Sequence, residues 1–377
     1  MSSMVFEFDN EIKGSAKIKV IGVGGGGCNA IDNMIDLGLK GVEFIALNTD
    51  AQALQQSKAN TKIQIGSQTT KGLGAGADPE VGRLAMEEDR EKLTNILSDS
   101  DMVFIAAGMG GGTGTGAAGV LAEITSGIGA LTVAIVTKPF KFEGLKRTVN
   151  ADKGIQKLKE NVDAMIIIHN QRLVQSTTDP NTSLKKAFGQ VNEVLYKAVR
   201  GIADLITCRG HINLDFADIK TTMKGMGDAM MGVGESEGEH ACIEAAQTAI
   251  QSVLLENIDI KGAKGLLVNI SACEELSLFE VEQAMDLIYQ ATGTTDVNVI
   301  FGVVTDNEMK DKVRVTVIAT GFETGSKNEK KSEYEKAFVQ KEIKSAAAER
   351  EQTVLPKFTK ASGTDYEIPA FLRMNKD

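Results

Sequence analysis

The sequence predicts an α/β protein in which a Rossmann-like parallel sheet is joined by one long central helix to a smaller α+β second domain. Apolar strand-like runs alternate with helical patterns from Lys17 to about Ile168, which is the order expected of a parallel sheet with helices on both faces. A single helical pattern then covers Ser183–Ile206, and further strands and helices follow it as far as Phe322. After Phe322 the composition becomes that of a disordered linker and tail.

Six short apolar runs supply the predicted parallel sheet. They are Ile18–Val23, Val42–Leu47, Lys62–Ile65, Met102–Ala107, Leu131–Thr137 and Ala164–Ile168. The segments Ala30–Leu37 and Ala117–Ile124 follow the first and fourth runs and are predicted to be helices. Because parallel strands end at the same edge of a sheet, the loops after these strands should face one crevice.

The stretch Gly108–Gly116, with the sequence GMGGGTGTG, is the most informative of these loops. Its six glycines let backbone N–H groups approach an anion, and its two threonines add hydroxyl donors. The helix that follows offers the positive end of its dipole. This combination predicts a polyphosphate site, although the lysine of the usual P-loop is absent.

Two further glycine loops help to decide between a dinucleotide and a nucleoside triphosphate. Gly22, Gly24 and Gly27 match the G-x-G-x-x-G fingerprint, and Asp50 follows the second strand, which alone would suggest an NAD(P)-dependent oxidoreductase. The third loop, Lys71–Ala77, adds more phosphate-binding capacity than a dinucleotide fold normally needs. A nucleoside triphosphate is therefore favoured, and the oxidoreductase stays as the alternative.

The segment Ser183–Ile206 is predicted to be one long helix, with Thr182 or Ser183 as its cap. Apolar residues recur at helical spacing over much of the surface of this helix, so we expect it to be buried between two domains. The second domain is expected to contain helices near Ala241–Leu254 and Leu278–Ala291 and strands at Lys264–Ser271, Asn298–Val304 and Arg314–Thr320.

The C-terminal region combines a charged stretch with a short apolar one. Glu323–Thr364 is rich in Lys, Glu, Ser and Ala, and a coil of its length (~40 residues) would span about 35 Å root-mean-square. The segment Asp365–Met374 regains apolar character but has no core to join. It is expected to be a docking peptide anchored by Ile368, Phe371 and Leu372.

Composition excludes several classes of function. The net charge of −10 over 377 residues argues against a general binder of nucleic acid or anionic membranes. Met1–Ser15 does not have the pattern of a signal peptide, and no apolar run approaches the ~18 residues of a membrane helix. The four cysteines are scattered and form no C-x-x-C pair, so neither a zinc site nor a disulfide framework is expected.

The motif GGGTGTG at Gly110–Gly116 is the signature of the tubulin/FtsZ superfamily, and the sequence resembles that family nearly continuously over about residues 15–322 and again at the C-terminus. The resemblance implies a disordered N-terminal segment (1–14), a GTP-binding domain (15–182) and a central helix (183–206). It further implies a GTPase-activating C-terminal domain (207–322), a flexible linker (323–364) and a partner-docking tail (365–377).

The resemblance also implies which residues contact GTP or GDP. They are Gly25, Gly26, Gly27, Cys28, Asn29, Ala75, Gly76, Ala77, Gly112, Thr113, Gly114, Glu143, Arg147, Phe188 and Asn192. The glycine loops would hold the phosphates, with Mg²⁺ between phosphate oxygens rather than on a defined set of side chains. Glu143 would hold the ribose and Arg147 the nucleotide, although four-residue spacing also suits a surface ion pair. Phe188 would stack on the purine and Asn192 would read its edge, while Cys28 could simply fill its loop.

The segment Gly210–Asp218, with the sequence GHINLDFAD, resembles the loop that enters the nucleotide pocket of the next subunit in this family. There Asp215 and Asp218 would polarise the attacking water, and Asn213 would hold the loop geometry. The two acids also lie at a helix start, where the dipole favours negative charge. One subunit would supply the phosphate loops and another the acids, and a head-to-tail contact of this kind that does not close into a ring propagates as a filament.

By resemblance, the chain is expected to be a cytoplasmic, GTP-hydrolysing cytoskeletal protein that polymerises into the bacterial division ring at mid-cell, beneath the inner membrane. Its tail residues Ile368, Pro369, Phe371, Leu372 and Arg373 would bind membrane-anchoring and regulatory division proteins of the FtsA and ZipA kind. Neither nucleic-acid binding nor direct membrane insertion is expected. The retained Asp215 and Asp218 argue against a family member that binds GTP without hydrolysing it.

Three positions depart from the family's pattern. Asn192 stands where aspartate is common, and it offers one carbonyl acceptor and an NH₂ group that could face guanine O6. His169 replaces a proline, and Gly119 stands where a proline often begins the helix after the signature. The last two changes are expected to alter loop rigidity and to leave the predicted catalytic roles intact.

Overall fold

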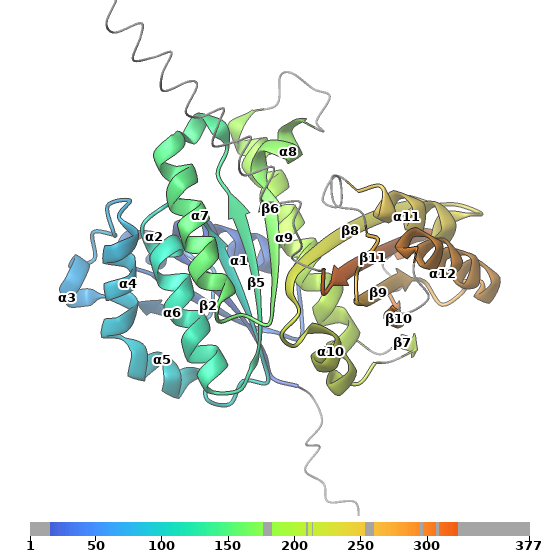
Figure 1. Ribbon diagram of the computed structural model, residues 1–377, viewed down its shortest axis with the longest axis horizontal. Helices are drawn as coiled ribbons and strands as arrows, with labels where there is room; N and C mark the ends of the chain where they lie inside the picture. Colours follow the sequence, from blue (N-terminus) through green and yellow to red (C-terminus); the bar gives the residue numbers. More distant parts are fainter. Residues whose placement is uncertain are drawn as a thin grey trace, which may run out of the picture. The chain divides into compact units, whose positions relative to one another are not determined.

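A sheet of eleven strands runs through the described part of the computed structural model. The strands are β1 (Ile18–Val23), β2 (Glu43–Asn48), β3 (Thr61–Gln64), β4 (Met102–Gly108), β5 (Leu131–Lys138), β6 (Ala164–His169), β7 (Gly210–Ile212), β8 (Gly227–Glu237), β9 (Gly265–Ala272), β10 (Asn298–Thr305) and β11 (Lys312–Thr320). Their order across the sheet is β3-β2-β1-β4-β5-β6-β8-β11-β9-β10-β7 (Figure 1).

The structure describes residues 16–175, 183–208, 210–212, 214–252, 260–293, 297–306 and 309–322. All of them belong to one unit, which spans residues 1–323. The predicted N-terminal segment 1–14, the linker 323–364 and the docking tail 365–377 lie outside the described residues, and so does Asn213.

The first six strands are all parallel, as the alternating sequence pattern predicts. Their ends agree with the predicted runs to within one residue. Successive residues face opposite sides of the sheet, so Val20 belongs to one hydrophobic cluster and Ile21 to another. Both faces are therefore buried, which explains why these strands are continuous apolar runs.

Helices cover both faces of this parallel sheet (Figure 1). The helices of the described residues are α1 (Gly24–Asp36), α2 (Ala51–Gln56), α3 (Ser67–Thr70), α4 (Pro79–Glu88), α5 (Arg90–Leu97), α6 (Thr113–Gly127), η1 (Lys141–Glu143), α7 (Leu145–Lys159), α8 (Asn170–Gln175), α9 (Leu184–Thr207), α10 (Phe216–Met223), α11 (Ala241–Ile250) and α12 (Leu278–Thr292). Apolar residues of α1 and α9 join the first cluster, and those of α4 to α7 join the second.

Two helices begin earlier than the sequence pattern suggests. The expected helix at Ala30–Leu37 starts at Gly24, and the one at Ala117–Ile124 starts at Thr113. Gly24–Gly27 therefore form the first turn of α1, whereas the signature stretch is a loop up to Gly112 and the first turn of α6 from Thr113. Glycine is disfavoured in helices by about 1 kcal/mol, but here tertiary packing outweighs that preference.

The long helix α9 agrees with its prediction to within one residue at each end, and the Ser183 hydroxyl caps it by accepting a hydrogen bond from Lys186 N–H at 3.3 Å. Beyond α9, β8 pairs antiparallel with β11, β11 pairs antiparallel with β9, and β9 pairs parallel with β10. A short parallel pairing of β6 with β8 joins the two halves of the sheet. The sequence pattern did not predict β8, and α11 ends at Ile250, before the expected Leu254.

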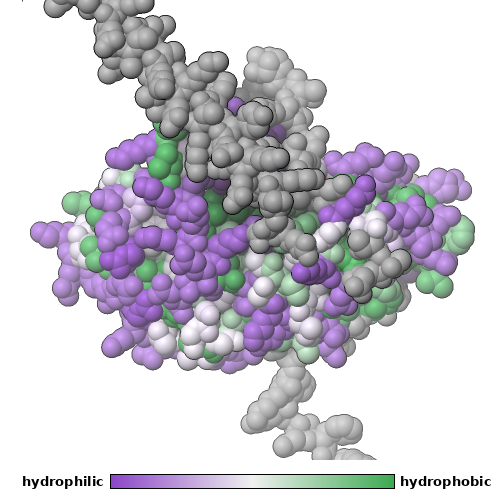
Figure 2. Space-filling model, in the orientation of Figure 1, coloured by the Kyte–Doolittle hydropathy of each residue, from purple (hydrophilic) through white to green (hydrophobic). Residues whose placement is uncertain are grey.

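The surface of the described residues is largely hydrophilic on the face shown in Figure 2, with apolar residues gathered near α11 and α12. Leu278 and Phe279, in the first turn of α12, are 80% and 65% exposed. Within the ranges that the structure describes, no helix combines the length and the apolar character that crossing a membrane requires.

Candidate functional site

The carboxyl ends of β1 and β4 bring two glycine loops together. The two strands are parallel neighbours, with Val23 opposite Ala107 at their ends. A Cβ atom on Gly24 would lie 2.8 Å from the backbone nitrogen of Gly114, so the two loops pack backbone against backbone. Both α1 and α6 begin at this edge, and their N-terminal N–H groups and dipoles favour an anion there.

The third glycine loop joins the same edge. Asp50 and Leu73 form an isolated antiparallel bridge, which ties the loop to the end of β2. Ala75 is buried beneath the signature loop, and a Cβ atom on Gly112 would lie 2.8 Å from the Cβ of Ala75. Gly76 and Ala77 are exposed and have left-handed backbones, with φ values of 57° and 60°. The three predicted loops thus converge.

The glycines of these loops divide into two kinds. A Cβ atom on Gly27 would lie 2.3 Å from a carbonyl oxygen of β4, and one on Gly116 would lie 1.9 Å from a carbonyl oxygen of α4. These two glycines therefore allow α1 to pack closely on β4 and α6 to pack closely on α4. On Gly25, Gly76 and Gly111, a Cβ atom would have no described atom within 4 Å. The second kind outlines an open surface beside the helix N-termini, which is the arrangement that a bound phosphate requires.

Cys28 and Asn29 have different surroundings within α1. The Cys28 thiol is buried and lies 3.7 Å from the carbonyl oxygens of Gly22 and Leu47, and burial raises its pKa to about 12. It therefore fills space beside the sheet, which leaves only main-chain atoms for contact with a ligand. Asn29 is exposed.

Threonines brace the signature loop. The hydroxyl of Thr113 lies 2.6 Å from that of Thr49, and the hydroxyl of Thr115 accepts a hydrogen bond from Gly110 N–H at 2.8 Å. Sequence reasoning did not single out Thr49, whose only signal is its position just after β2. Asp50 accepts hydrogen bonds from two N–H groups of α2 at 2.9 and 3.1 Å, so the acid of the dinucleotide fingerprint serves as a helix cap.

Glu143 and Arg147 form an ion pair at the rim of the signature loop. Arg147 Nη1 donates to Glu143 Oε2 at 2.5 Å, and Phe140 N–H donates to Glu143 Oε1 at 3.0 Å. The Glu143 side chain is 15% exposed and that of Arg147 is 50% exposed. The backbone of Arg147 packs against Gly110, whose Cβ would lie 2.8 Å from the Arg147 carbonyl oxygen. Glu143 and Arg147 therefore form the ion pair that their spacing suggests, and they also lie next to the signature loop.

The N-terminal part of α9 presents an exposed aromatic ring. Phe188 is 40% exposed, and its ring meets that of the buried Phe140 edge-on at a centroid distance of 5.2 Å. Asn192 lies one turn later and is partly buried. Phe140 also donates its N–H to Glu143. Phe140 therefore connects Phe188, predicted to stack on the base, with Glu143, predicted to hold the ribose.

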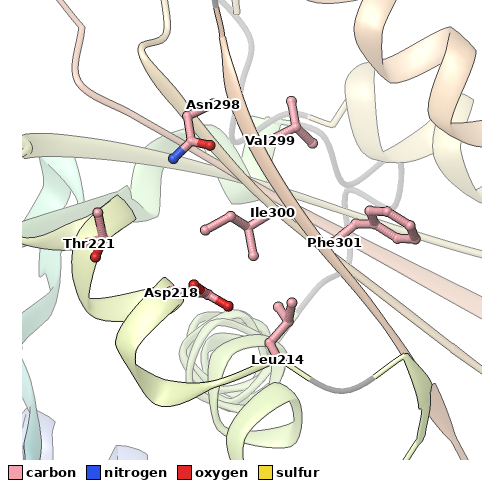
Figure 3. A pocket seen from close by; sticks show the side chains of 7 residues that line it. All are labelled: Leu214, Asp218, Thr221, Asn298, Val299, Ile300 and Phe301. Carbon is pink, nitrogen blue, oxygen red and sulfur yellow. The ribbon is translucent and has the colours of Figure 1, made fainter.

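Asp215 and Asp218 lie at the start of α10, and both are exposed. The Asp218 N–H group donates to the Asp215 carbonyl oxygen at 3.0 Å. Asp218 borders an open pocket of about 410 Å³ between α10 and the first half of β10 (Figure 3). The residues that line this pocket are Leu214, Asp218, Thr221, Asn298, Val299, Ile300 and Phe301.

The acids and the glycine loops lie at opposite edges of the parallel sheet. Shortly after α10, Gly225 N–H donates to the Asp163 carboxylate at 3.3 Å and Gly227 N–H donates to the Asp163 carbonyl at 2.9 Å. Asp163 directly precedes β6, so α10 ends at the amino edge of the sheet, whereas the glycine loops follow the carboxyl ends of β1 and β4. The structure therefore does not bring the two sets of predicted residues together within one chain.

The two positions that replace prolines have ordinary surroundings. His169 ends β6, and burial lowers its pKa from 6.5 to about 4, with Arg172 and Lys138 adding to the effect. A Cβ atom on Gly119 would lie 3.8 Å from Lys157, which is normal contact, so no close approach requires glycine there.

The described residues contain no group of three or more His, Cys, Asp or Glu side chains that could hold a metal ion. Mg²⁺ suits the site formed by the glycine loops, because this ion binds substrate phosphates and keeps several waters instead of requiring a cage of protein ligands. The open glycine surface fits a magnesium-bound polyphosphate held in this way.

Comparison with known proteins assigns the family. Residues 17–178 match the model of the tubulin/FtsZ family GTPase domain, and residues 227–323 match that of the FtsZ family C-terminal domain. The empty FtsZ dimer from M. jannaschii is 44% identical, with a TM-score of 0.77, over 82% of this chain and 89% of that chain. The GTPγS-bound protofilament of CetZ2 from Haloferax volcanii is 22% identical, with a TM-score of 0.73 over 87% and 99% of the two chains, and it supports the fold alone. The chain belongs to the tubulin/FtsZ family of GTPases.

Proposed function

We propose that this chain binds GTP with Mg²⁺ at its three glycine loops, assembles head to tail into filaments of the division ring, and hydrolyses GTP at sites shared between neighbouring subunits. GTP hydrolysis and filament formation follow from membership of the family. The shared site is supported by one observation above the others, which is that the exposed acids and the open glycine surface lie at opposite edges of the sheet.

The phosphates would bind at the open face of Gly25, Gly76 and Gly111, beside the N-termini of α1 and α6. Backbone N–H groups of Gly26, Gly27, Gly112, Thr113 and Gly114 are candidates for hydrogen bonds to phosphate oxygens, with Ala75 and Ala77 closing the third loop. Mg²⁺ would neutralise phosphate charge as the terminal group is transferred.

The nucleoside would lie between α9 and the segment around Glu143. The exposed ring of Phe188 offers a face for stacking the purine, and Asn192 would hydrogen-bond its edge. Glu143 would hold the ribose hydroxyls, and Arg147, already paired with it, would reach the phosphates.

Asp215 and Asp218 would act on the nucleotide of the next subunit. Neither pairs with a cation in the described residues, and both are exposed, so they are available to orient and polarise a water molecule across an interface. A contact between the two different ends of identical subunits propagates as a filament when its rotation does not close into a ring. The isolated chain would therefore hydrolyse GTP slowly, and assembly would complete the site.

The remaining assignments extend this proposal. The chain would divide into residues 15–182, 183–206 and 207–322, and act in the cytoplasm at mid-cell. Its tail, with Ile368, Phe371 and Leu372 as anchors, would link filaments to membrane-anchoring and regulatory division proteins of the FtsA and ZipA kind.

GTP-dependent sedimentation combined with phosphate release tests the proposal. The wild-type chain should sediment and release phosphate with GTP and Mg²⁺, and Asp218→Ala should still bind GTP and sediment but lose turnover by about 100-fold or more. Asp286→Ala, an exposed carboxylate of α12, serves as the control and should behave as wild type. Normal turnover by Asp218→Ala would show that the acids are not part of the active site.

A further inference from the structure

Arg200 lies in the C-terminal third of α9 and ties this helix to the end of β10. Its Nη2 atom donates to Asp306 Oδ2 at 2.8 Å, its Nε atom to Asp204 Oδ2 at 3.0 Å, and its Nη1 atom to the Tyr196 hydroxyl at 2.7 Å. Asp306 directly follows the last residue of β10. Because the guanidinium is planar and rigid, three partners in three directions fix its position and orientation.

Asp204 makes this connection costly to break. The residue is 7% exposed, and burial raises the pKa of its carboxyl group although Arg200 opposes the shift. Its other oxygen accepts a hydrogen bond from the Cys208 thiol at 3.8 Å, at the C-terminal cap of α9. Removing the Arg200 guanidinium would leave a buried carboxylate without its hydrogen-bonded cation, so the last turns of α9 would have to adjust.

The end of β10 that Arg200 holds also carries β7. Val303 and Val304 pair antiparallel with Ile212 and Gly210, just before Asp306. Gly210 packs so closely that a Cβ atom there would lie 1.9 Å from the Val303 carbonyl oxygen. The strand β7 therefore has little freedom to move relative to β10.

A second contact links α9, β10 and the residue before the first acid. A Cβ atom on Gly302 of β10 would lie 2.6 Å from Leu205 of α9 and 3.5 Å from Leu214. Leu214 directly precedes Asp215, the residue at the N-cap of α10. The relative position of α9 and β10 thus sets where α10 begins, and Figure 1 shows β7, β10 and α10 gathered beside the C-terminal part of α9.

We propose that Arg200 is a positioning residue for GTP hydrolysis, because its guanidinium fixes the strand pair β7–β10 beside which α10 begins, and the start of α10 presents Asp215 and Asp218 to the neighbouring subunit's site. The inference rests on the proposed role of these two acids. Arg200 itself touches neither the nucleotide nor the acids. Its loss should therefore slow the chemical step inside filaments while the glycine loops, at the other edge of the sheet, keep their affinity for GTP.

Lys197 provides a matched control on the same helix. It lies one turn before Arg200, is similarly half-buried, and pairs with Glu193 at 3.1 Å and with Glu235 of β8 at 3.5 Å. β8 pairs with β11 and β6 and does not carry β7. Lys197→Gln therefore removes a cation and an α9–sheet contact without loosening the support of the acids.

The experiment compares full-length wild type, Arg200→Gln, Arg200→Lys and Lys197→Gln. The measurements are GTP affinity before assembly, the sedimented fraction, and kcat and KM for phosphate release per sedimented subunit. Arg200→Gln should lower kcat by about 10- to 100-fold, as expected for a displacement of about 1 Å at the reacting groups, with KM and GTP affinity unchanged. Arg200→Lys keeps the charge but loses the planar guanidinium, so its kcat should lie between those of wild type and Arg200→Gln. Lys197→Gln should have the kcat of wild type.

A combined variant separates positioning from general weakening. If Arg200 acts through the two acids, adding Arg200→Gln to a variant that lacks both, Asp215→Ala/Asp218→Ala, should cause no further loss of turnover. Should circular dichroism show that Arg200→Gln is unfolded, Asp306→Ala removes the acceptor on the β10 side while Arg200 keeps Asp204 and Tyr196, and it should show the same loss of kcat. Wild-type turnover in the folded variant, an equal loss in Lys197→Gln, or a further loss on the background that lacks both acids would overturn the inference. Wild-type turnover in Asp218→Ala would instead overturn the proposed function.

Discussion

Alanine at two neighbouring glycines of α1 should separate nucleotide binding from folding. At Gly25 a new methyl group would have no described atom within 4 Å, whereas at Gly27 it would lie 2.3 Å from the carbonyl oxygen of Ala106 in β4. We therefore expect Gly25→Ala to fold normally and bind nucleotide poorly. Gly27→Ala should instead destabilise the protein.

The size of each effect follows from the local geometry. The Gly27 contact is about 1 Å shorter than the 3.4 Å at which ordinary contact begins, and the atom that it meets is backbone and cannot rotate away. Overpacking of this kind costs about 3 kcal/mol, or roughly 6 °C in Tm for a chain of this size. Gly25→Ala should change Tm by only about 1 °C. Its methyl group would occupy the phosphate side of the loop, so the loss of one charge-assisted hydrogen bond should weaken GTP binding by about tenfold or more.

Thermal unfolding without nucleotide and fluorescence titration with a labelled GTP analogue measure the two quantities separately. Both variants should be compared with wild type at the same protein concentration, because bound nucleotide and assembly also raise Tm. If Gly27→Ala unfolds at the wild-type temperature, or Gly25→Ala binds GTP as tightly as wild type, the division of the glycines into packing and binding positions is wrong.

Three further predictions concern the nucleoside and the end of β6. Phe188→Ala should weaken GTP binding by about tenfold through lost stacking, whereas Leu184→Ala, at a more exposed position on the same helix, should not, as titration would show. Asn192→Asp should raise the preference for GTP over ITP by about tenfold, since the added acceptor pairs with the amino group that inosine lacks, and competition binding would detect it. His169 binds its proton in the unfolded chain below pH 6.5 but in the folded chain only below about 4, so stability should fall as the pH falls between these values. His169→Gln should flatten this dependence when urea midpoints are compared at pH about 7 and about 5, and an unchanged slope would contradict the assignment.

The parallel half of the fold could be predicted closely because both of its faces are buried. A strand such as β4 is then a continuous apolar run whose ends coincide with glycine or polar residues. The strand β8 escaped prediction for the opposite reason. Its sequence, GDAMMGVGESE, is rich in glycine and acids, and it is held in the sheet by pairing with β11, more than 70 residues away in the chain. Tertiary pairing outweighs local preference there.

For the site, residue types and spacing revealed the glycine loops and the two acids. They did not reveal which glycines serve close packing and which face a bound phosphate. Gly27 and Gly25 look alike in the sequence, and only the position of β4 distinguishes them. The bond between Thr49 and Thr113 and the link from Arg200 to Asp306 were missed because the partners are 64 and 106 residues apart. Sequence periodicity carries no information on such contacts.

The pairing of β6 with β8 has a mechanical consequence if the chain binds neighbours at its two ends, as proposed. Among the described residues, three pairs of β6 and β8, from Ala164–Gly227 to Ile166–Ala229, join the two halves of the sheet. Tension along a filament would enter through the acid-bearing end of one half and leave through the glycine loops of the other. The hydrogen bonds between β6 and β8 and the side-chain contacts of α9 would carry that load in parallel. The β6–β8 pairing and the helix would therefore together set the stiffness of each subunit.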